Sequence, residues 1–418
     1  SNRPPSPSLQ SRRSIKSSAS TSPPSRSPVA GWSRKKEANW FRPSNFSSTL
    51  SSSSALEPLP VACFVTSHGF GHGTRTAAVL QALARQAPGL KLDLFSTLPE
   101  WFWEENLSSL ASFRSHQVRT DVGLVQTSAF EHDLDKTLSE LEAFVSFGSE
   151  QVERARKTLL ETGPAVILCD VSPLGLFLGK ELGIPTVLLE NFTWDWIYGA
   201  YLEADSRFGP YIEQLGELFG SADLRIQTEP LCERMQEYPL VPPIFREFEQ
   251  SPERTLEGLD LPAGSRFLLV TTGGIPHEYS FLERLKGRQD VHFLVTGSFA
   301  QLQHEENLTL LPHRCGFHFP DLVRASCGVA GKVGYGTVAE TWGARVPLVA
   351  VYRDNFRESS ALRSFVEGNL PNMEASQADF LNGSWIGRID NFLALSPIEK
   401  RRQESGACEA AKLTLSIA

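Results

Sequence analysis

The chain alternates short apolar, β-branched runs with longer amphipathic segments in two series, which a proline-rich stretch separates. Strands alternating with helices at this spacing predict parallel sheets with helices on both faces. We therefore expect an α/β fold of two doubly wound, Rossmann-like domains that face each other across a cleft. The predicted strands are 60–66, 91–96, 165–170, 185–190, 267–274, 291–297, 307–311, 327–331 and 346–352. Helices are predicted at 73–86, 173–182, 336–344 and 355–368, and a long polar, periodic region covers 130–162.

Proline spacing indicates where the first domain ends. The segment YPLVPPIFREFEQSPERT (238–255) breaks the alternation, because proline lacks a backbone donor and fixes φ. We predict an N-terminal acceptor domain over 58–240, a linker over 241–255 and a C-terminal nucleotide-sugar donor domain over 256–418. Folds of this class bind ligands at the carboxyl ends of their strands, which here predicts a site in the cleft.

Residues 1–57 differ in composition from the rest. They are rich in serine and proline and hold nine Lys/Arg against two acidic residues, a net charge of +7. Removing them from the totals of 40 basic and 48 acidic residues leaves 31 and 46, a net −15 that argues against a nucleic-acid-binding body. The tail fits a plastid transit peptide or an ordinary disordered extension. The first residue is Ser1, so we expect any targeting signal here to be incomplete.

The localisation expected is therefore cytoplasmic, or plastid if the tail is a transit peptide. No apolar run is long enough for a transmembrane helix. The cysteines lack CxxC spacing, so we expect reduced, buried thiols and neither disulfides nor a zinc site. The six cysteines are Cys63, Cys169, Cys232, Cys315, Cys327 and Cys408.

The first glycine-rich loop, SHGFGHGTR (67–75), follows a predicted strand and precedes a helix. Such a loop lets backbone N–H groups approach an anion or a sugar, and we assign Gly69 and Gly71 to acceptor binding. Its glycines follow GxGxG and not the dinucleotide pattern GxGxxG. The second strand, KLDLFS (91–96), also lacks a terminal acid, so hydride transfer is disfavoured.

Two histidines of this loop are catalytic candidates. His72 stands just before the helix, where an imidazole can remove a proton from an attacking hydroxyl. For His68 a structural role in the turn is favoured, and catalysis is the second reading. Asp170, at the end of the apolar run AVILCD, is the candidate that orients His72, although it could equally cap the next helix.

The second glycine-rich segment, GKVGYGTVAE (331–340), suits a nucleotide diphosphate. Helix N–H groups and the Thr337 hydroxyl would cradle the phosphates, Lys332 would add charge, and Glu340 would accept from ribose hydroxyls. A plain tight turn is the alternative for such glycines. The predicted donor-binding set is Gly273, Gly274, Lys332, Gly334, Tyr335, Gly336, Thr337 and Glu340, with Asp354 and Asn355 for the hydroxyls of the transferred sugar.

An aromatic segment, NFTWDWIYGAYL (191–202), follows a predicted strand end. Aromatic faces stack on the C–H faces of sugars, so we assign Trp194, Asp195 and Trp196 to acceptor binding. The alternative is that these large rings simply fill space between the domains.

These motifs together resemble the nucleotide-sugar glycosyltransferases of family 28 type, and more closely the glycosyltransferase-like N-terminal half of plant L-arabinokinases. SHGFGHGTR, CDVSP (169–173), the aromatic segment and GKVGYGTVAE carry the resemblance over about 60–415. In the plant glucosyltransferase donor box, which is also similar, the roles fall on Gly334, Thr337 and Glu340, and Lys332 stands where that box has histidine. No PxxxGLGSS phosphate loop of sugar kinases occurs, so kinase chemistry is not carried over.

The resemblance implies a GT-B fold and a transferase that moves a hexose or related sugar from a nucleotide sugar, UDP-linked by preference, to an acceptor hydroxyl. It implies a metal-independent reaction without a bound cofactor, and no nucleic-acid partner. Two alternatives stay open: a sugar-nucleotide epimerase or hydrolase on the same fold, and a non-catalytic nucleotide-sugar-binding regulatory module.

Overall fold

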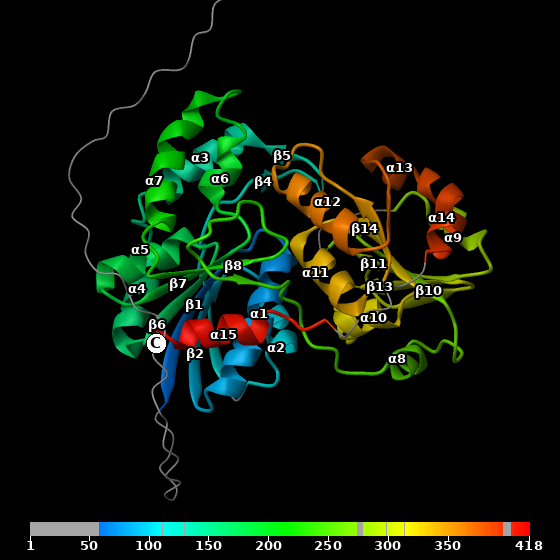
Figure 1. The fold of residues 1–418 in the computed structure, drawn as a ribbon, viewed down its shortest axis with the longest axis horizontal. Coiled ribbons are helices and arrows are strands. Elements are labelled where there is room, and N and C mark those ends of the chain that lie inside the picture. The colour runs from blue at the N-terminus through cyan, green and yellow to red at the C-terminus, as the bar shows by residue number, and fades with distance from the viewer. Residues whose placement is uncertain are drawn as a thin grey trace, which may run out of the picture. The chain divides into compact units, whose positions relative to one another are not determined.

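The computed structural model describes residues 58–110, 112–128, 130–273, 279–297, 299–312, 314–395 and 403–418. The proposed transit peptide therefore lies outside the described residues, and so does Gly274. Within them, two large sheets form, each with helices on both faces (Figure 1). No helix of the described part reaches the length and apolarity that crossing a membrane requires.

The first sheet has the strand order β3-β2-β1-β6-β7-β8-β9, and all its pairings are parallel. A short antiparallel pair, β4 with β5, stands apart from it. The strands of the sheet are β1 (Leu59–Val65), β2 (Leu90–Ser96), β3 (Phe113–Gln117), β6 (Val166–Asp170), β7 (Thr186–Glu190), β8 (Leu224–Thr228) and β9 (Leu240–Val241), and the separate pair is β4 (Val125–Gln126) with β5 (His132–Asp133). The helices are α1 (Phe70–Gln86), α2 (Glu100–Asn106), α3 (Leu134–Phe144), α4 (Glu150–Thr162), α5 (Pro173–Leu182), α6 (Trp194–Gly199) and α7 (Gly209–Phe219), with a 3₁₀ turn at Ser206–Phe208.

The second sheet has the order β12-β13-β11-β10-β14-β15-β16 and is parallel except for β12 with β13. Its strands are β10 (Phe267–Thr271), β11 (His292–Gly297), β12 (Gln303–Glu305), β13 (Leu308–Pro312), β14 (Gly328–Lys332), β15 (Leu348–Val351) and β16 (Asn372–Glu374). The helices are α8 (Pro252–Gly258), α9 (Leu282–Lys286), α10 (Phe319–Ala325), α11 (Tyr335–Ala344), α12 (Glu358–Asn369), α13 (Gln377–Asn382), α14 (Ile389–Leu393) and α15 (Ala407–Leu415), with a 3₁₀ segment at Ser384–Arg388.

Alternating side chains of the central strands fill two cores per sheet. Ala62 and Phe64 of β1 point into one core, whereas Val61, Cys63 and Val65 point into the other. The second sheet repeats this pattern. Strands buried on both faces read as continuous apolar runs, which is why the sequence locates them to within a few residues. The expectation of buried thiols is confirmed for Cys63 and Cys169, whereas Cys408 on α15 is exposed; the three partly exposed thiols are Cys232, Cys315 and Cys327.

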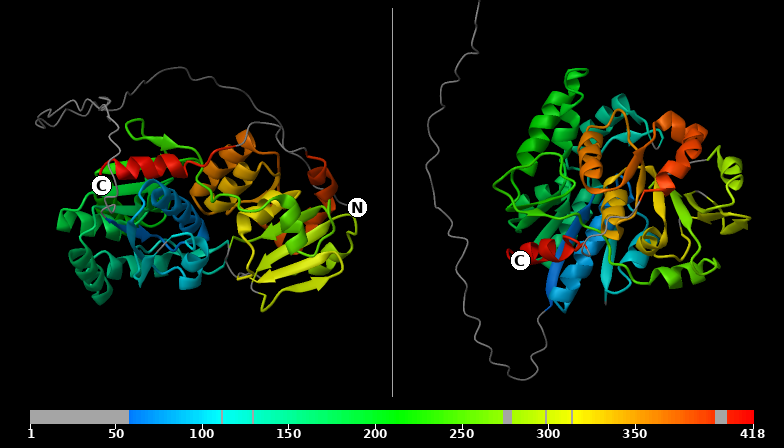
Figure 2. Two further views of the ribbon diagram at one scale, coloured as in Figure 1. Left: turned by 90° about the horizontal axis from the view of Figure 1, so that it is seen from below. Right: turned by 45° about the vertical axis from the view of Figure 1, so that its right-hand side comes forward.

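The last helix packs against the first sheet and not the second. Ala407, Ala410 and Ala411 of α15 join the core beside α1, and Figures 1 and 2 show this red helix next to the blue segments. The sequence placed all of 256–418 in the C-terminal domain, and α15 departs from that boundary. Its small residues allow a close approach to α1, a contact that sequence spacing does not reveal.

Each sheet has one point where the chain reverses its direction of travel across the sheet. In the first sheet, β1 lies between β2 and β6, with Val65 opposite Asp170 at the carboxyl ends. In the second, β10 lies between β11 and β14, with Thr271 opposite Gly331. Connections diverge at such a switch point and leave room for a ligand. Both glycine-rich loops begin at these positions.

Candidate functional site

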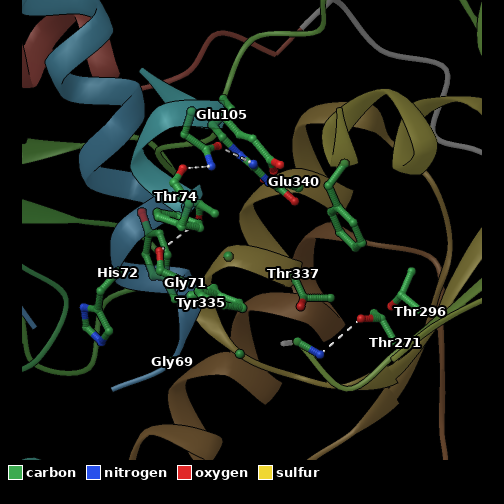
Figure 3. A pocket seen from close by; sticks show the side chains of 18 of the residues that line it. Gly69, Gly71, His72, Thr74, Glu105, Thr271, Thr296, Tyr335, Thr337 and Glu340 are labelled. Atoms are coloured by element: carbon green, nitrogen blue, oxygen red, sulfur yellow. Dashed lines mark hydrogen bonds and ion pairs between the residues drawn. The ribbon is translucent and has the colours of Figure 1, made fainter. Parts of the chain in front are cut away.

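A cavity of about 570 Å³ is lined by residues from both switch points. Such a volume is typical of small-molecule sites. His72 and Gly71 contribute from α1, and Thr337 of α11 and Thr271 of β10 contribute from the other half (Figure 3). Of the predicted site residues, the structure brings to this cavity His68, Gly69, Gly71, His72, Gly273, Lys332, Gly334, Tyr335, Gly336, Thr337 and Glu340.

His72 and Asp170 form the pair that the sequence suggested. The Nδ1 atom of His72 lies 2.8 Å from Oδ1 of Asp170, although α1 and β6 are far apart in the chain. Asp170 does not cap α5, because the Ser172 side chain accepts from the Gly175 N–H and fills that role. His72 lines the cavity and Asp170 is fully buried behind it. This arrangement fixes the ring of a histidine that meets the cavity.

Arg75 is the residue of this loop whose contacts the sequence did not predict. Its Nη2 and Nε atoms donate to both oxygens of Asp170, at 2.6 and 2.8 Å, and Thr76 adds a further hydrogen bond. Burial raises the pKa of Asp170, but Arg75 and His72 outweigh burial and bring it down to about 2. Asp170 therefore stays ionised, and the guanidinium compensates much of its charge.

Arg75 also connects the two halves. Its guanidinium lies over the Tyr335 ring, 4.6 Å from the centroid, and Nη1 donates to Asn191 at 2.7 Å. Asn191 in turn donates to Glu358 of α12 at 2.9 Å. A buried arginine held by a carboxylate, an amide and an aromatic face resists displacement. Helices α1, α11 and α12 are thereby linked through polar contacts next to the cavity.

The second glycine-rich segment has the features expected of a phosphate site. Helix α11 begins at Tyr335, and its N-cap residue Gly334 has no side-chain capping bond, so the first N–H groups are available. Lys332, only 8% exposed, lines the cavity here. Burial, and then the charge of Arg353, lower the pKa of Lys332 to about 7. An anion would restore the charged form.

Glu340 is already engaged. Its Oε1 atom accepts from Nη2 and Nε of Arg246, at 2.6 and 2.9 Å, and Arg246 also donates to Asn106 at 2.7 Å. Arg246 comes from the predicted linker and was not anticipated. Tyr335 is similarly occupied at its hydroxyl, which contacts Thr228 and accepts from the Ile244 N–H. A ribose role of Glu340 would therefore have to use its second oxygen, Oε2.

The predicted sugar-binding pair lies elsewhere. Asp354 and Asn355 are exposed and do not line the cavity, whereas Arg353 and Phe356 do. Arg353 is 7% exposed, lies 3.5 Å from the Phe356 ring centroid, and has the Glu358 carboxylate 4.0 Å away. The turn after β15 directs Arg353 inward and its two successors outward. The segment after β15 does reach the cavity, but through Arg353 and not through the predicted Asp354 and Asn355.

The aromatic segment supports the site from behind. Trp194 is buried and donates from Nε1 to Asp121 at 2.6 Å, and Trp196 lies under the Arg357 guanidinium. Asp195 lies beside Gly216 of α7. None of these three acceptor candidates lines the cavity, and Phe192 is the residue of the segment that does. Trp194 fits the alternative interpretation, in which a large ring fills space inside the protein.

His68 lines the cavity and contacts Trp194 edge-on, with ring centroids 5.0 Å apart. Its Nε2 atom is buried without a hydrogen-bond partner among the described residues. Burial, followed by the charge of Arg353, holds the pKa of His68 well below its usual value. His68 is therefore neutral at pH 7.

One group of side chains in the described part of the chain is close enough to share a metal ion. Ligand atoms of Glu249, His318 and Asp321 lie within 4.8 Å of one another. Asp321 already accepts from His318 Nδ1 and from the Glu249 and Gln250 N–H groups. These bonds tie the first turn of α10 to the Glu249–Gln250 segment and already engage the Asp321 carboxylate. Metal independence stays a prediction.

Comparison with protein families and with curated proteins finds one relative. No family model matches the chain. The chain is similar to L-arabinokinase of Arabidopsis thaliana, with 27% identity over 352 residues, 82% of this chain and 33% of that protein. It thus spans about a third of the length of this relative. Assignment to family 28 in particular stays a prediction.

Solved structures match over most of the chain. A UDP-glucosyltransferase from Polygonum tinctorium has a TM-score of 0.55 at 14% identity, covering 87% of this chain and 94% of that one. The glycosyltransferase SnogD from Streptomyces nogalater gives 0.53 at 17%, covering 87% and 100%. An Arabidopsis thaliana structure complexed with UDP gives 0.58 at 12%, covering 86% and 100%. At these identities the likeness concerns the fold, and it confirms the predicted α/β GT-B architecture.

Proposed function

We propose that this protein is a glycosyltransferase that moves a hexose or related sugar from a UDP-linked donor to an acceptor hydroxyl. One observation carries the proposal. A single cavity is lined by His72, which Asp170 holds from behind, and by the open N-terminus of α11 with Lys332. In this proposal, His72 is the proton acceptor and the start of α11 holds the diphosphate, and both line the same space. The UDP linkage is supported by two matching structures, of which one is described as a UDP-glucosyltransferase and the other as complexed with UDP.

In this mechanism the donor diphosphate lies against the N–H groups that begin α11, beside Lys332. His72 takes the proton of the acceptor hydroxyl through Nε2, while that oxygen attacks the anomeric carbon. The bond from that carbon to the diphosphate oxygen breaks, and the leaving UDP keeps the electron pair. Helix N–H groups and the Lys332 ammonium stabilise the charge that develops. We propose that no metal ion takes part.

A second candidate, a nucleotide-sugar-binding module without catalysis, is favoured by Arg75. Its bidentate contact compensates the charge of Asp170, so this carboxylate gives less stabilisation to an imidazolium than an unpaired one would. Binding through α11 and Lys332 does not depend on that pair. Donor binding without turnover would be the property of such a module.

The first test is calorimetric titration of the full chain with UDP-, GDP- and dTDP-sugars. We expect one UDP-sugar to bind, Lys332→Met to weaken it by about tenfold, and the exposed control Lys180→Met to leave it unchanged. The same Lys332 variant should bind uridine as the wild type does, because uridine lacks phosphate. Failure of every nucleotide sugar to bind the folded protein contradicts the proposal.

Turnover separates the two candidates. His72→Ala should abolish UDP release in the presence of an acceptor and leave donor affinity nearly intact. An equal loss of both would show that His72 binds the donor instead. Donor binding by the wild type, with no acceptor supporting UDP release, would favour the binding module.

A further inference from the structure

A second cavity, of about 510 Å³, opens on the carboxyl edge of the first sheet. It is formed by the segments that follow β1 and β2, by the stretch from Arg119 to Gln126, and by Gln151 at the start of α4. Its polar lining side chains are Ser67, Thr97, Arg119, Asp121, Gln126 and Gln151. Of its lining residues, only Ser67 and His68 belong to a sequence motif, the first glycine-rich loop.

His68 lines both cavities. This residue therefore borders both the space assigned to the donor and this second space. A molecule in the second cavity would lie next to His68, which also lines the cavity that contains His72. The unpartnered Nε2 atom of His68 is a polar group at this boundary.

Asp121 gives the second cavity its chemistry. The carboxylate is 4% exposed, and its Oδ2 atom accepts from Thr66 and from Nε1 of Trp194. No described residue donates to its Oδ1 atom. Burial raises the pKa of Asp121 to about 6, against the opposing hydrogen bond from Thr66. At neutral pH the group is mostly ionised, so Oδ1 can accept a hydrogen bond from a ligand.

The surrounding charges favour a neutral ligand. Arg119 donates to the Asp121 carbonyl at 3.0 Å and pairs with Glu140, so its charge is compensated. With the Arg119 charge paired in this way, the Asp121 carboxylate would repel an anionic ligand that lies against it. A flat apolar ligand would cover the Asp121 oxygen without a hydrogen bond, at a cost of about 1–3 kcal/mol.

We propose that this second cavity is the acceptor subsite and that it takes a neutral, polyhydroxylated, sugar-like acceptor oriented by Asp121. The proposal rests on the proposed function, because the first cavity must hold the donor. Hydroxyl groups match the serine, threonine and glutamine side chains of the lining, which can both donate and accept. Trp194, predicted to contact the acceptor directly, would act through its hydrogen bond to Asp121.

The test is saturation-transfer NMR on the full chain with UDP present at saturation. The probes are a set of neutral monosaccharides and sugar alcohols, the matching uronic acids, and a simple phenol. Asp121→Asn keeps the shape of the side chain. Its single amide oxygen can accept from Thr66 and Trp194 or from the ligand, but not from both. Gln126→Trp narrows the cavity, and it is the second test variant if Asp121→Asn does not fold. Gln303→Trp, on edge strand β12 and away from both cavities, is the control.

We expect neutral sugars to bind and the uronic acids and the phenol to bind more weakly. Asp121→Asn should weaken sugar binding by about tenfold, Gln126→Trp should abolish it, and both should leave UDP affinity unchanged. Sugar binding that survives both variants, or tighter binding of the phenol, overturns the proposal, as does UDP binding with no sugar binding. Failure of UDP itself to bind is a different result, since it refutes the proposed function.

Discussion

Gly71 and Gly336, one from each glycine-rich loop, meet across the two halves of the site. A Cβ at Gly71 would lie 3.2 Å from the Gly336 nitrogen, and a Cβ at Gly336 would lie 3.1 Å from the Gly71 Cα. Neither residue needs glycine for its φ angle, since neither is among the residues with positive φ. The close approach of two backbones is therefore the reason for glycine at both positions.

Gly336→Ala should push the two loops apart by a few tenths of an ångström. Because Gly336 is helical, alanine should also favour α11 by about 0.5–1 kcal/mol, so we expect unchanged or slightly higher stability. UDP-sugar affinity should fall several-fold, as measured by calorimetry. Gly368→Ala in α12 meets nothing within 4 Å and is the control, with a similar helix effect and no effect on affinity. Equal affinities for both variants would contradict the role of this contact.

Asp170 should make stability depend on pH in the acid range. Its pKa of about 2 lies below the usual value of 3.8, so the ionised group stabilises the folded state above pH 4. That contribution, about 2–3 kcal/mol, is lost as the pH falls from 4 towards 2. Urea unfolding at several pH values measures it.

Asp170→Asn tests the assignment, because it leaves Arg75 buried without its carboxylate. We expect a loss of about 3–5 kcal/mol at pH 7, and a smaller difference from the wild type near pH 2. Asp354→Asn, at an exposed position, is the matched control and should change little. A constant difference between Asp170→Asn and the wild type at all pH values would show that the carboxylate charge is not responsible.

Lys332 should couple donor affinity to proton uptake. Its pKa of about 7 rises when a diphosphate binds beside it, so the complex holds more protons than the free protein. Affinity should therefore fall as the pH increases above 7. Calorimetry in two buffers of different ionisation enthalpy measures the uptake directly. Lys332→Arg, which stays charged, should remove this pH dependence, and an unchanged slope in that variant would assign the proton to another group.

Removing the same lysine should stabilise the protein without ligand. The lowered pKa means that the charged form destabilises the fold, a cost that is present below pH 7 and disappears as the pH rises towards 10.5. Lys332→Met should raise the free energy of unfolding at pH 6 by about 1–3 kcal/mol while weakening UDP binding. The gain should shrink at pH 9. Destabilisation at both pH values would show that Lys332 has stabilising contacts.

Much of the fold was predictable, because parallel strands buried on both faces appear as continuous apolar runs. The predicted strand 165–170 corresponds to Val166–Asp170, and the predicted helix 173–182 has the bounds of α5. Helix signals were local as well, with Ser172 as N-cap and Gly183 in the left-handed conformation at the end of α5. The two glycine-rich loops were found because they follow strands at switch points.

The parts that sequence did not predict depend on pairing between distant residues. Arg75 lies inside a recognised motif, but its partner Asp170 is 95 residues away, so spacing gives no sign of the ion pair. The inward direction of Arg353, in place of Asp354, is set by one backbone turn after β15. The return of α15 to the first sheet is likewise a tertiary contact between small residues. Ion pairs and side-chain directions are set by the folded structure, and the pattern of residues along the sequence does not predict them.

Variants of Glu340 can distinguish a role in ribose binding from a role in holding Arg246. Because Arg246 is buried against its Oε1 atom, Glu340→Ala should cost about 3–5 kcal/mol in urea unfolding, through an unpaired guanidinium. Arg246→Met alone leaves the carboxylate unpaired, and the double variant removes both charges and should recover most of the stability. If Glu340 also accepts from the ribose through Oε2, the double variant should still bind UDP about tenfold more weakly than the wild type. Calorimetry on the double variant, compared with Arg246→Met, therefore measures the ribose contact without the ion pair. Equal UDP affinity in these two variants would restrict Glu340 to holding Arg246 in place.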